Sequence, residues 1–248
     1  RSYNMLRSFS PIIYEAQDEL PNNQGALLRF RTDKVGTACA IPFTKVKVQK
    51  AIKYKNDIHT QPNLFFSNLY SQKVTGSVLN RSINNLEPVE RYIAPWELIS
   101  MMSENCQVKY NMKLSSIDKN DRNVIPIIST IPMPALMKVV GWPEKPEFPS
   151  QKIWTQKARI GSPECKVHQT IYYPDPMLPY YRISVVGDIV ISEFIREPEA
   201  SIGPHMMDVL MEDFGIKPSK LVDLKSSEQY LGKIKPINEE LRKQFIFE

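Results

Sequence analysis

Apolar and polar residues alternate in two different ways along this chain, and the change comes near residue 150. Over residues 1–24, apolar positions 3, 5, 6 and 9 have the spacing of the last turns of a helix. The run PIIYEA at residues 11–16 then predicts a short buried strand. Residues 25–38 favour a helix or an extended turn, and strict alternation over residues 43–54 predicts a half-exposed strand.

Helical and strand patterns continue to alternate up to residue 142. Residues 95–105 have a proline near a helix start and helically spaced apolar residues, so we expect a short amphipathic helix. Alternation returns after Cys106. Residues 124–142 (VIPIISTIPMPALMKVVGW) predict a buried strand, a proline-rich turn and a helix that ends at Gly141.

Strand patterns dominate the second part of the chain. Four β-type runs separated by Gly, Pro and Asp predict an antiparallel meander; they cover residues 152–160, 165–174, 180–188 and 189–197. A helix is expected at residues 204–214, stopped by Gly215, and one more strand at residues 229–237. The whole pattern indicates an α/β chain with a mainly antiparallel second part.

Composition narrows the class of protein. The 248 residues, 42% of them apolar, suffice for one large or two smaller domains. The net charge of +5 is spread along the chain, so no nucleic-acid partner is predicted. Three distant cysteines without a C-x-x-C pair fit a cytoplasmic protein and predict no metal site. No apolar run approaches the roughly 18 residues of a membrane span.

The first strand ends on an acid, Glu15. In dinucleotide-binding folds, the second strand of the βαβ unit ends beside the adenosine ribose, and an acid there accepts hydrogen bonds from the ribose hydroxyls. The order of a helix end, a short loop and PIIYEA matches that arrangement. The alternative is an ordinary exposed acid at the end of a strand.

The stretch PIIYEA resembles the second strand of FAD-dependent oxidoreductases of the amine oxidase and glutathione-reductase-like superfamily. The segment GALLRFR is similar to the stretch that passes the flavin pyrophosphate in that family, and IISTIPMP is similar to its return strand near the cofactor. The resemblance implies an FAD cofactor bound by seven residues: Glu15, Gly25, Arg29, Arg31, Ser129, Thr130 and Pro132. A salt bridge, a solvated face or plain turn chemistry is the alternative for the arginines and for the Ser-Thr-Pro segment.

The resemblance also divides the chain. It implies α/β architecture with a partial, Rossmann-like FAD-binding domain at residues 1–150. A mainly antiparallel α+β substrate-binding domain follows at residues 151–235, and residues 236–248 return to the first domain. The glycine-rich loop of the family is not found before Glu15, so we expect a partial chain. The segment YYPDPMLPYY is a candidate wall of a substrate pocket through Tyr172, Tyr173, Tyr180 and Tyr181, and packing between strands is the alternative.

Two functions follow as hypotheses. The first is an FAD-dependent oxidoreductase that passes a hydride from an amine or a related small molecule to the flavin, whose redox chemistry requires no catalytic triad from the protein. The second is a non-catalytic interaction or structural module that retains the flavoprotein fold. No catalytic residue, electron acceptor or oligomeric state is predicted.

Overall fold

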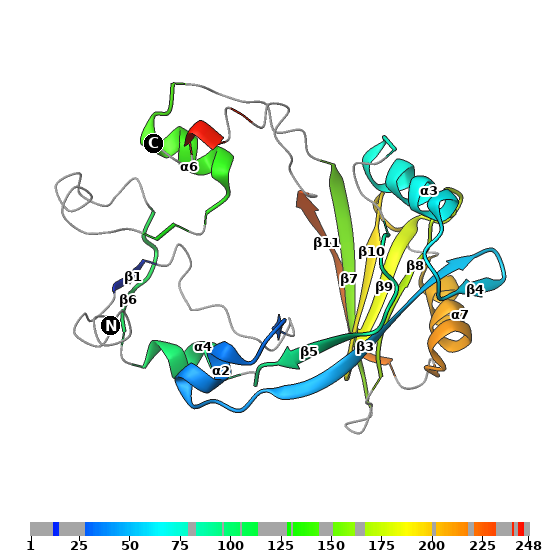
Figure 1. Cartoon of the computed structure of the whole chain (residues 1–248), viewed down its shortest axis with the longest axis horizontal. Coiled ribbons are helices and arrows are strands. Elements are labelled where there is room, and N and C mark those ends of the chain that lie inside the picture. Colours follow the sequence, from blue (N-terminus) through cyan, green and yellow to red (C-terminus); the bar gives the residue numbers. More distant parts are fainter. Residues whose placement is uncertain are drawn as a thin grey trace. The chain divides into compact units, whose positions relative to one another are not determined.

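The computed structural model of the chain forms two compact units (Figure 1). The first unit comprises Arg1–Thr44, Ile93–Pro149 and Lys235–Glu248, and the second comprises Lys45–Tyr92 and Ser150–Ile234. The structure describes residues 12–14, 28–78, 83–95, 97–104, 106–113, 128–129, 131–143, 151–161, 167–199, 202–217, 221–231, 240 and 243–245. Residues 45–92, which the resemblance assigns to the FAD-binding domain, lie in the second unit, and the functional division of the chain stays a prediction.

Parallel strand pairing occurs in the first unit. Strand β1 (Ile12–Tyr14) pairs with β6 (Gln107–Lys109) in parallel, with Ile12 opposite Gln107. The predicted strand at PIIYEA is therefore confirmed. The same unit contains β2 (Arg29–Phe30), α2 (Lys34–Cys39), α4 (Leu98–Ser103) and α6 (Met133–Val140).

The helices of the first unit end where local chemistry stops them. Helix α6 ends at Gly141, whose φ of 70° is left-handed and suits a residue without a Cβ. Pro95 precedes α4, as the sequence predicts. A small core joins Ile41, Ala94 and Leu98. The buried strand predicted before Ser129 lies mostly outside the described residues; Ile128, which is described, is in no strand and is 94% exposed.

The second unit is built on one mixed sheet. Its strands lie in the order β11-β7-β10-β9-β8-β3-β5, and β4 pairs with β3. Their bounds are β3 Thr44–Tyr54, β4 Asp57–His59, β5 Val89–Ile93, β7 Lys152–Ile160, β8 His168–Tyr172, β9 Tyr180–Val186, β10 Ile189–Phe194 and β11 Leu221–Leu231. Strands β8, β9 and β10 form antiparallel hairpins, whereas β3 and β8 are parallel.

All four strands predicted after residue 150 are present, but they do not form a simple meander. Strand β7 pairs with β10 rather than with β8, its successor in the chain. The spatial order β7-β10-β9-β8 is that of a Greek key, in which one long connection carries the chain past two strands. The alternation of apolar and polar residues within a strand does not predict this pairing, because it indicates which face of the strand is buried and not which strand lies beside it.

Two helices cover the sheet of the second unit. Helix α7 (Ile202–Phe214) supplies Met206, Val209, Leu210 and Phe214 to a core that includes Ala51 of β3. Helix α3 (Leu64–Thr75) supplies Phe66, Tyr70 and Val74 to a second core that includes Ile52. Since successive residues of a strand point to opposite faces, α7 and α3 lie on opposite sides of the sheet. The sequence pattern did not predict α3.

Candidate functional site

The predicted cofactor residues all belong to the first unit, and the structure describes four of the seven. Glu15, Gly25 and Thr130 lie outside the described residues. Arg29 is an exposed residue of β2, and Arg31 is exposed in the bend that follows it. Ser129 and Pro132 come directly before α6. The grouping of these residues around a cofactor stays a prediction.

The hydroxyl of Ser129 is buried without a hydrogen-bond partner in the described residues, which plain turn chemistry does not require. A buried hydroxyl without a partner loses its hydration without replacement, which costs about 1–3 kcal/mol. Such an atom can be satisfied by a bound group.

The beginning of α6 offers less to an anion than a usual helix start. Pro132 occupies the N-cap, and its carbonyl accepts the N–H groups of Ala135 (2.9 Å) and Leu136 (3.0 Å). Pro134 has no N–H to donate. Of the first helical residues, only Met133 is left with an amide that the helix does not use. A phosphate would therefore gain little from this helix terminus.

The four predicted pocket tyrosines are distributed between two cores. Tyr173 and Tyr180 belong to the core under α7 and meet edge to face with ring centroids 4.8 Å apart. Tyr181 belongs to the core under α3, where Tyr172 packs against it. Tyr70 of α3 meets both of the latter rings edge to face, at 5.4 Å from Tyr172 and 6.1 Å from Tyr181. Three of the four are at most 2% exposed, so their visible role is packing.

A β-bulge explains how neighbouring residues Tyr181 and Arg182 reach one acid. Between β9 and β10, Arg182 faces Glu193 and Tyr180 faces Phe194, which leaves Tyr181 as the extra residue. The Tyr181 hydroxyl donates to Glu193 Oε1 (3.0 Å), and Arg182 donates to both oxygens of the same carboxylate. Burial by itself would lower the pKa of Arg182. The hydrogen bonds and the charge of Glu193 outweigh this effect, so the pKa is raised.

Tyr173 takes part in a polar cluster on the α7 side. Its hydroxyl donates to Asp213 Oδ2 (2.8 Å), and Lys53 Nζ lies 2.5 Å from Asp213 Oδ1. The Asp213 side chain is only 3% exposed, so the Lys53 charge and the Tyr173 hydroxyl together compensate its buried charge. Burial and the Asp213 charge raise the Tyr173 pKa above its ordinary value, and the phenol stays protonated.

Lys73 of α3 is a buried charged residue that the sequence analysis did not single out. Its Nζ donates to three backbone carbonyls: those of Tyr173 (2.8 Å) and Asp175 (2.6 Å) in the loop that joins β8 to β9, and that of Tyr180 (2.6 Å), the first residue of β9. Three acceptors match the three hydrogens of an ammonium group. Burial opposes that charge and lowers the pKa of Lys73 to about 7; Asp175 counteracts the shift and Arg196 adds to it.

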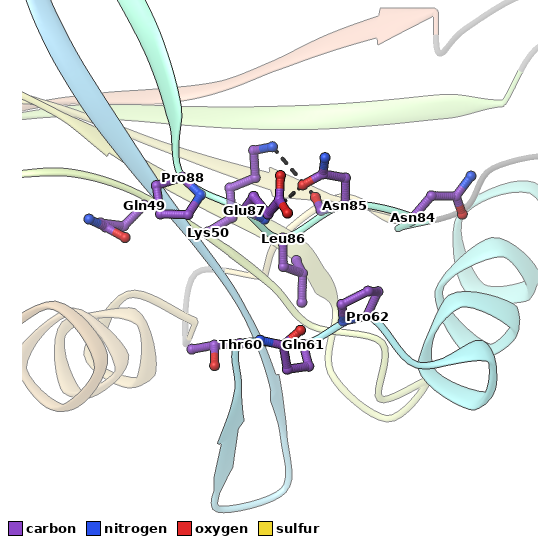
Figure 2. Close-up of a pocket in the computed structure, with 10 residues that line it drawn as sticks. All are labelled: Gln49, Lys50, Thr60, Gln61, Pro62, Asn84, Asn85, Leu86, Glu87 and Pro88. Carbon is purple, nitrogen blue, oxygen red and sulfur yellow. Dashed lines mark hydrogen bonds between the residues drawn. The ribbon is translucent and has the colours of Figure 1, made fainter.

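A polar pocket of about 350 Å³ opens in the second unit (Figure 2). Three short segments line it: two residues of β3, the connection from β4 to α3, and the chain that leads to β5. We call it the amide pocket; its residues are Gln49, Lys50, Thr60, Gln61, Pro62, Asn84, Asn85, Leu86, Glu87 and Pro88. None of the predicted cofactor residues or tyrosines is among them.

Other chemistry is not found in the described residues. They contain no group of three or more His, Cys, Asp or Glu side chains placed to hold a metal ion. None of their helices has both the length and the apolar character needed to cross a bilayer. Cys39 and Cys106 are free thiols.

Comparisons with known proteins concern the fold. No family model matches the sequence, and no curated protein matches it. Among solved structures, reduced UDP-galactopyranose mutase has a TM-score of 0.51 at 12% identity, over 90% of this chain and 77% of the mutase. The p-nitrophenol 4-monooxygenase PnpA from Pseudomonas putida DLL-E4 has a TM-score of 0.48 at 9% identity, over 95% of this chain and 65% of its own. The chain thus has a mixed α/β fold similar to that of the mutase.

Proposed function

We propose that this chain is part of a flavin-dependent oxidoreductase that binds FAD through its first unit. The proposal is carried by the resemblance of PIIYEA, GALLRFR and IISTIPMP to FAD-dependent oxidoreductases, and the fold similarity to reduced UDP-galactopyranose mutase over 90% of this chain supports it. The parallel pairing of β1 with β6 supports it, because a dinucleotide is bound at the carboxyl ends of parallel strands.

The residues present fit such a cofactor at several positions. Ser129 offers a buried hydroxyl without a partner in the described chain, and Arg29 and Arg31 offer cationic groups of the kind that bind a pyrophosphate. Glu15 follows β1 directly, where an acid would accept hydrogen bonds from the ribose. Gly25, Thr130 and Pro132 complete the proposed set.

In the proposed enzyme the flavin and the residues of this chain have different roles. A bound flavin supplies the redox chemistry by accepting a hydride from a small substrate, for which an amine is our hypothesis. The residues of this chain would hold the cofactor: the acid orients the ribose, the arginines neutralise the phosphates, and Ser129 provides a hydrogen bond. The sheet of the second unit is the proposed substrate-binding part.

The first test is spectroscopic. The purified full-length protein of which this chain is part should show flavin absorption bands, and its apo-form should regain them and a higher melting temperature when FAD is added. A colourless protein that FAD does not stabilise would contradict the proposal. It would favour the second hypothesis, a module that keeps the fold for interaction rather than catalysis.

Glu15 gives a sharper prediction. Glu15→Gln keeps the size of the side chain but replaces a charged acceptor by a neutral amide, so a hydrogen bond worth roughly 1.5–3 kcal/mol is weakened. In the full-length protein, we expect FAD affinity to fall about ten- to a hundredfold in a titration of the apo-form. The melting temperature without FAD should stay the same. Equal affinities for wild type and variant would remove Glu15 from the cofactor site.

A further inference from the structure

The guanidinium of Arg182 has one occupied edge and one free edge. Its Nε and Nη2 donate to the two carboxylate oxygens of Glu193 on the neighbouring strand β10. A guanidinium carries five N–H groups, so three remain: the two of Nη1 and the second one of Nη2. Among the described residues, Glu193 is the only one that accepts hydrogen bonds from Arg182. Arg182 therefore keeps a second pair of parallel N–H donors.

The free donors point away from the acid. The three nitrogens of the planar guanidinium are spread evenly around its central carbon, and two of them face Glu193, so Nη1 is directed to the opposite side. Because Coulomb energy falls with distance, an anion at Nη1 is attracted by the guanidinium more strongly than it is repelled by Glu193. The Arg182 side chain is 30% exposed, against 10% for that of Glu193, so the guanidinium is the more accessible of the two groups.

Two hydroxyls lie beside Arg182 on the same face of the sheet. In the pairing of β8 with β9, Tyr172 is opposite Arg182 and Thr170 is opposite Ser184, and alternate residues of a strand share a face. Thr170 is thus the diagonal neighbour of Arg182, and such neighbours are roughly 7–8 Å apart, within reach of a long side chain.

The hydroxyl pair has an unused donor. Thr170 Oγ1 and Ser184 Oγ are 3.0 Å apart, so one of them donates to the other. Two hydroxyls have two protons, and the second proton has no acceptor among the described residues. Both residues are buried, and a buried donor without an acceptor costs about 1–3 kcal/mol. A bound acceptor would remove this cost.

The charge of this part of the face favours an anion. Two rows of paired residues cross it from β3 to β10, and their charged side chains are Lys50, Arg182 and Glu193. The Arg182–Glu193 pair has no net charge, and Lys50, opposite Thr170 on β3, adds one positive charge. The unused groups at Arg182 and at the hydroxyl pair are donors. A ligand whose oxygens only accept hydrogen bonds matches them.

We propose that the face of the sheet at Arg182, Thr170 and Ser184 binds a small oxyanion, a carboxylate or phosphate group, through the free guanidinium edge and the unused hydroxyl proton. Arginine binds such groups with two parallel N–H donors. Glu193 already holds the guanidinium in place, which lowers the entropy cost of binding. This goes beyond the proposed flavin function and does not depend on it, because all three residues lie on β8 and β9 of the second unit.

The test follows the arginine Nε–H resonances of the full chain by NMR at neutral pH and constant ionic strength. Acetate and inorganic phosphate are the anions, and acetamide is the neutral analogue of acetate. Arg182→Lys identifies the Arg182 signal by its loss, and sequential assignment of the wild-type spectrum does so if that variant does not fold. We expect a saturable shift of this signal with acetate, with phosphate or with both, and none with acetamide. A response to one anion alone identifies the class of ligand.

The control in the same spectra is Arg159, whose exposed guanidinium pairs with Asp188 and should show no saturable shift. Three outcomes would overturn the proposal: no saturable shift of Arg182 with either anion, an equal shift with acetamide, or an equal shift at Arg159.

A double variant tests the hydroxyl pair. Thr170→Val with Ser184→Ala replaces both partners of one hydrogen bond by apolar groups of similar shape, so the free energy of unfolding should change little. The dissociation constant of the anion should rise roughly two- to tenfold, the effect of one hydrogen bond. The control is Thr44→Val, which removes an exposed hydroxyl at the start of β3. Wild-type affinity in the double variant, or equal weakening in the control, would contradict the site as proposed.

Discussion

At the scale of single residues, Lys73 is held in an environment that both requires and opposes its charge. The three carbonyls of Tyr173, Asp175 and Tyr180 need three N–H donors, and only the ammonium has them. Burial favours the neutral amine. As a result, the pKa of Lys73 lies near neutral pH. The loop between β8 and β9 is held by the hydrogen bonds that the protonated side chain donates.

The first prediction concerns the pH dependence of stability. The unfolded chain keeps the Lys73 proton up to about pH 10.5, and the folded chain keeps it only up to about 7. Between these values the unfolded state binds more protons, so the free energy of unfolding should rise with pH, by at most about 1.4 kcal/mol per pH unit. Urea titrations at several pH values should show this rise in the wild type and not in Lys73→Met.

The control for this prediction is Lys47→Met, which changes an exposed lysine of β3. Its stability should follow the wild-type pH dependence. Other groups that titrate in this range, such as the buried tyrosines, are shared by all three proteins and cancel in the differences. Parallel curves for wild type and Lys73→Met would show that Lys73 does not titrate as we expect.

Ser129 should behave in opposite ways with and without cofactor. Ser129→Ala removes a buried hydroxyl that has no partner in the described chain, so the apo-protein should be as stable as wild type or more stable by up to about 1 kcal/mol. FAD affinity should fall several-fold if the hydroxyl binds the cofactor. Thermal unfolding without FAD and a fluorescence titration with FAD measure the two effects. A loss of stability without FAD would mean that the hydroxyl already has a structural partner.

At the scale of elements, the bulge between β9 and β10 concentrates polar contacts on Glu193. That carboxylate is 8% exposed and serves both Arg182 and Tyr181. Removing one partner of a buried ion pair leaves the other charge uncompensated, at a cost of roughly 3–5 kcal/mol. The Arg182 side chain is 30% exposed, and water compensates it in part.

Glu193→Gln is therefore expected to destabilise the protein by about 2–3 kcal/mol, less than a fully buried pair would lose. The comparison is Asp188→Asn, which breaks the exposed pair with Arg159 and should cost less than about 1 kcal/mol. Chemical denaturation of both variants measures the difference. Similar losses would mean that the Glu193 pair is solvated like a surface pair.

At the scale of the whole molecule, the two units should respond differently to a cofactor. The centre of the second unit is apolar, with Ile171, Ile183, Val185 and Phe194 fully buried, so its amides should exchange slowest with solvent hydrogen. Because the proposed cofactor residues all lie in the first unit, FAD should increase protection there and leave β8, β9 and β10 unchanged. Hydrogen exchange with mass spectrometry measures both. Protection confined to the second unit would move the cofactor site away from our proposal.

Local patterns were sufficient for much of the fold. The alternation over β3, the four β-type runs, and the helices α4, α6 and α7 follow from residues that are neighbours in the chain. Gly141 and Gly215 end two helices with φ values of 70° and 68°, as glycine near the end of a helical pattern indicates. Period and turn chemistry act over a few residues, so a single sequence contains them completely.

Helix α3 was missed for a physical reason. Its buried face includes Ser67, Ser71 and Lys73, which interrupt the apolar stripe that marks an amphipathic helix. Each of the three is satisfied by backbone groups outside the helix, and the partners of Lys73 lie about a hundred residues away. The partners that make these polar residues acceptable inside the protein are not visible from local spacing.

The sequence by itself determined where most strands and helices form, because hydrophobic period, proline and glycine act locally. The tertiary structure alone decided the pairing of β7 with β10, the division of four neighbouring tyrosines between two cores, the three backbone carbonyls that bind Lys73, and the amide pocket. Each of these joins segments that are distant along the chain. Their contacts depend on the order of strands in the sheet, which hydrophobic alternation does not specify.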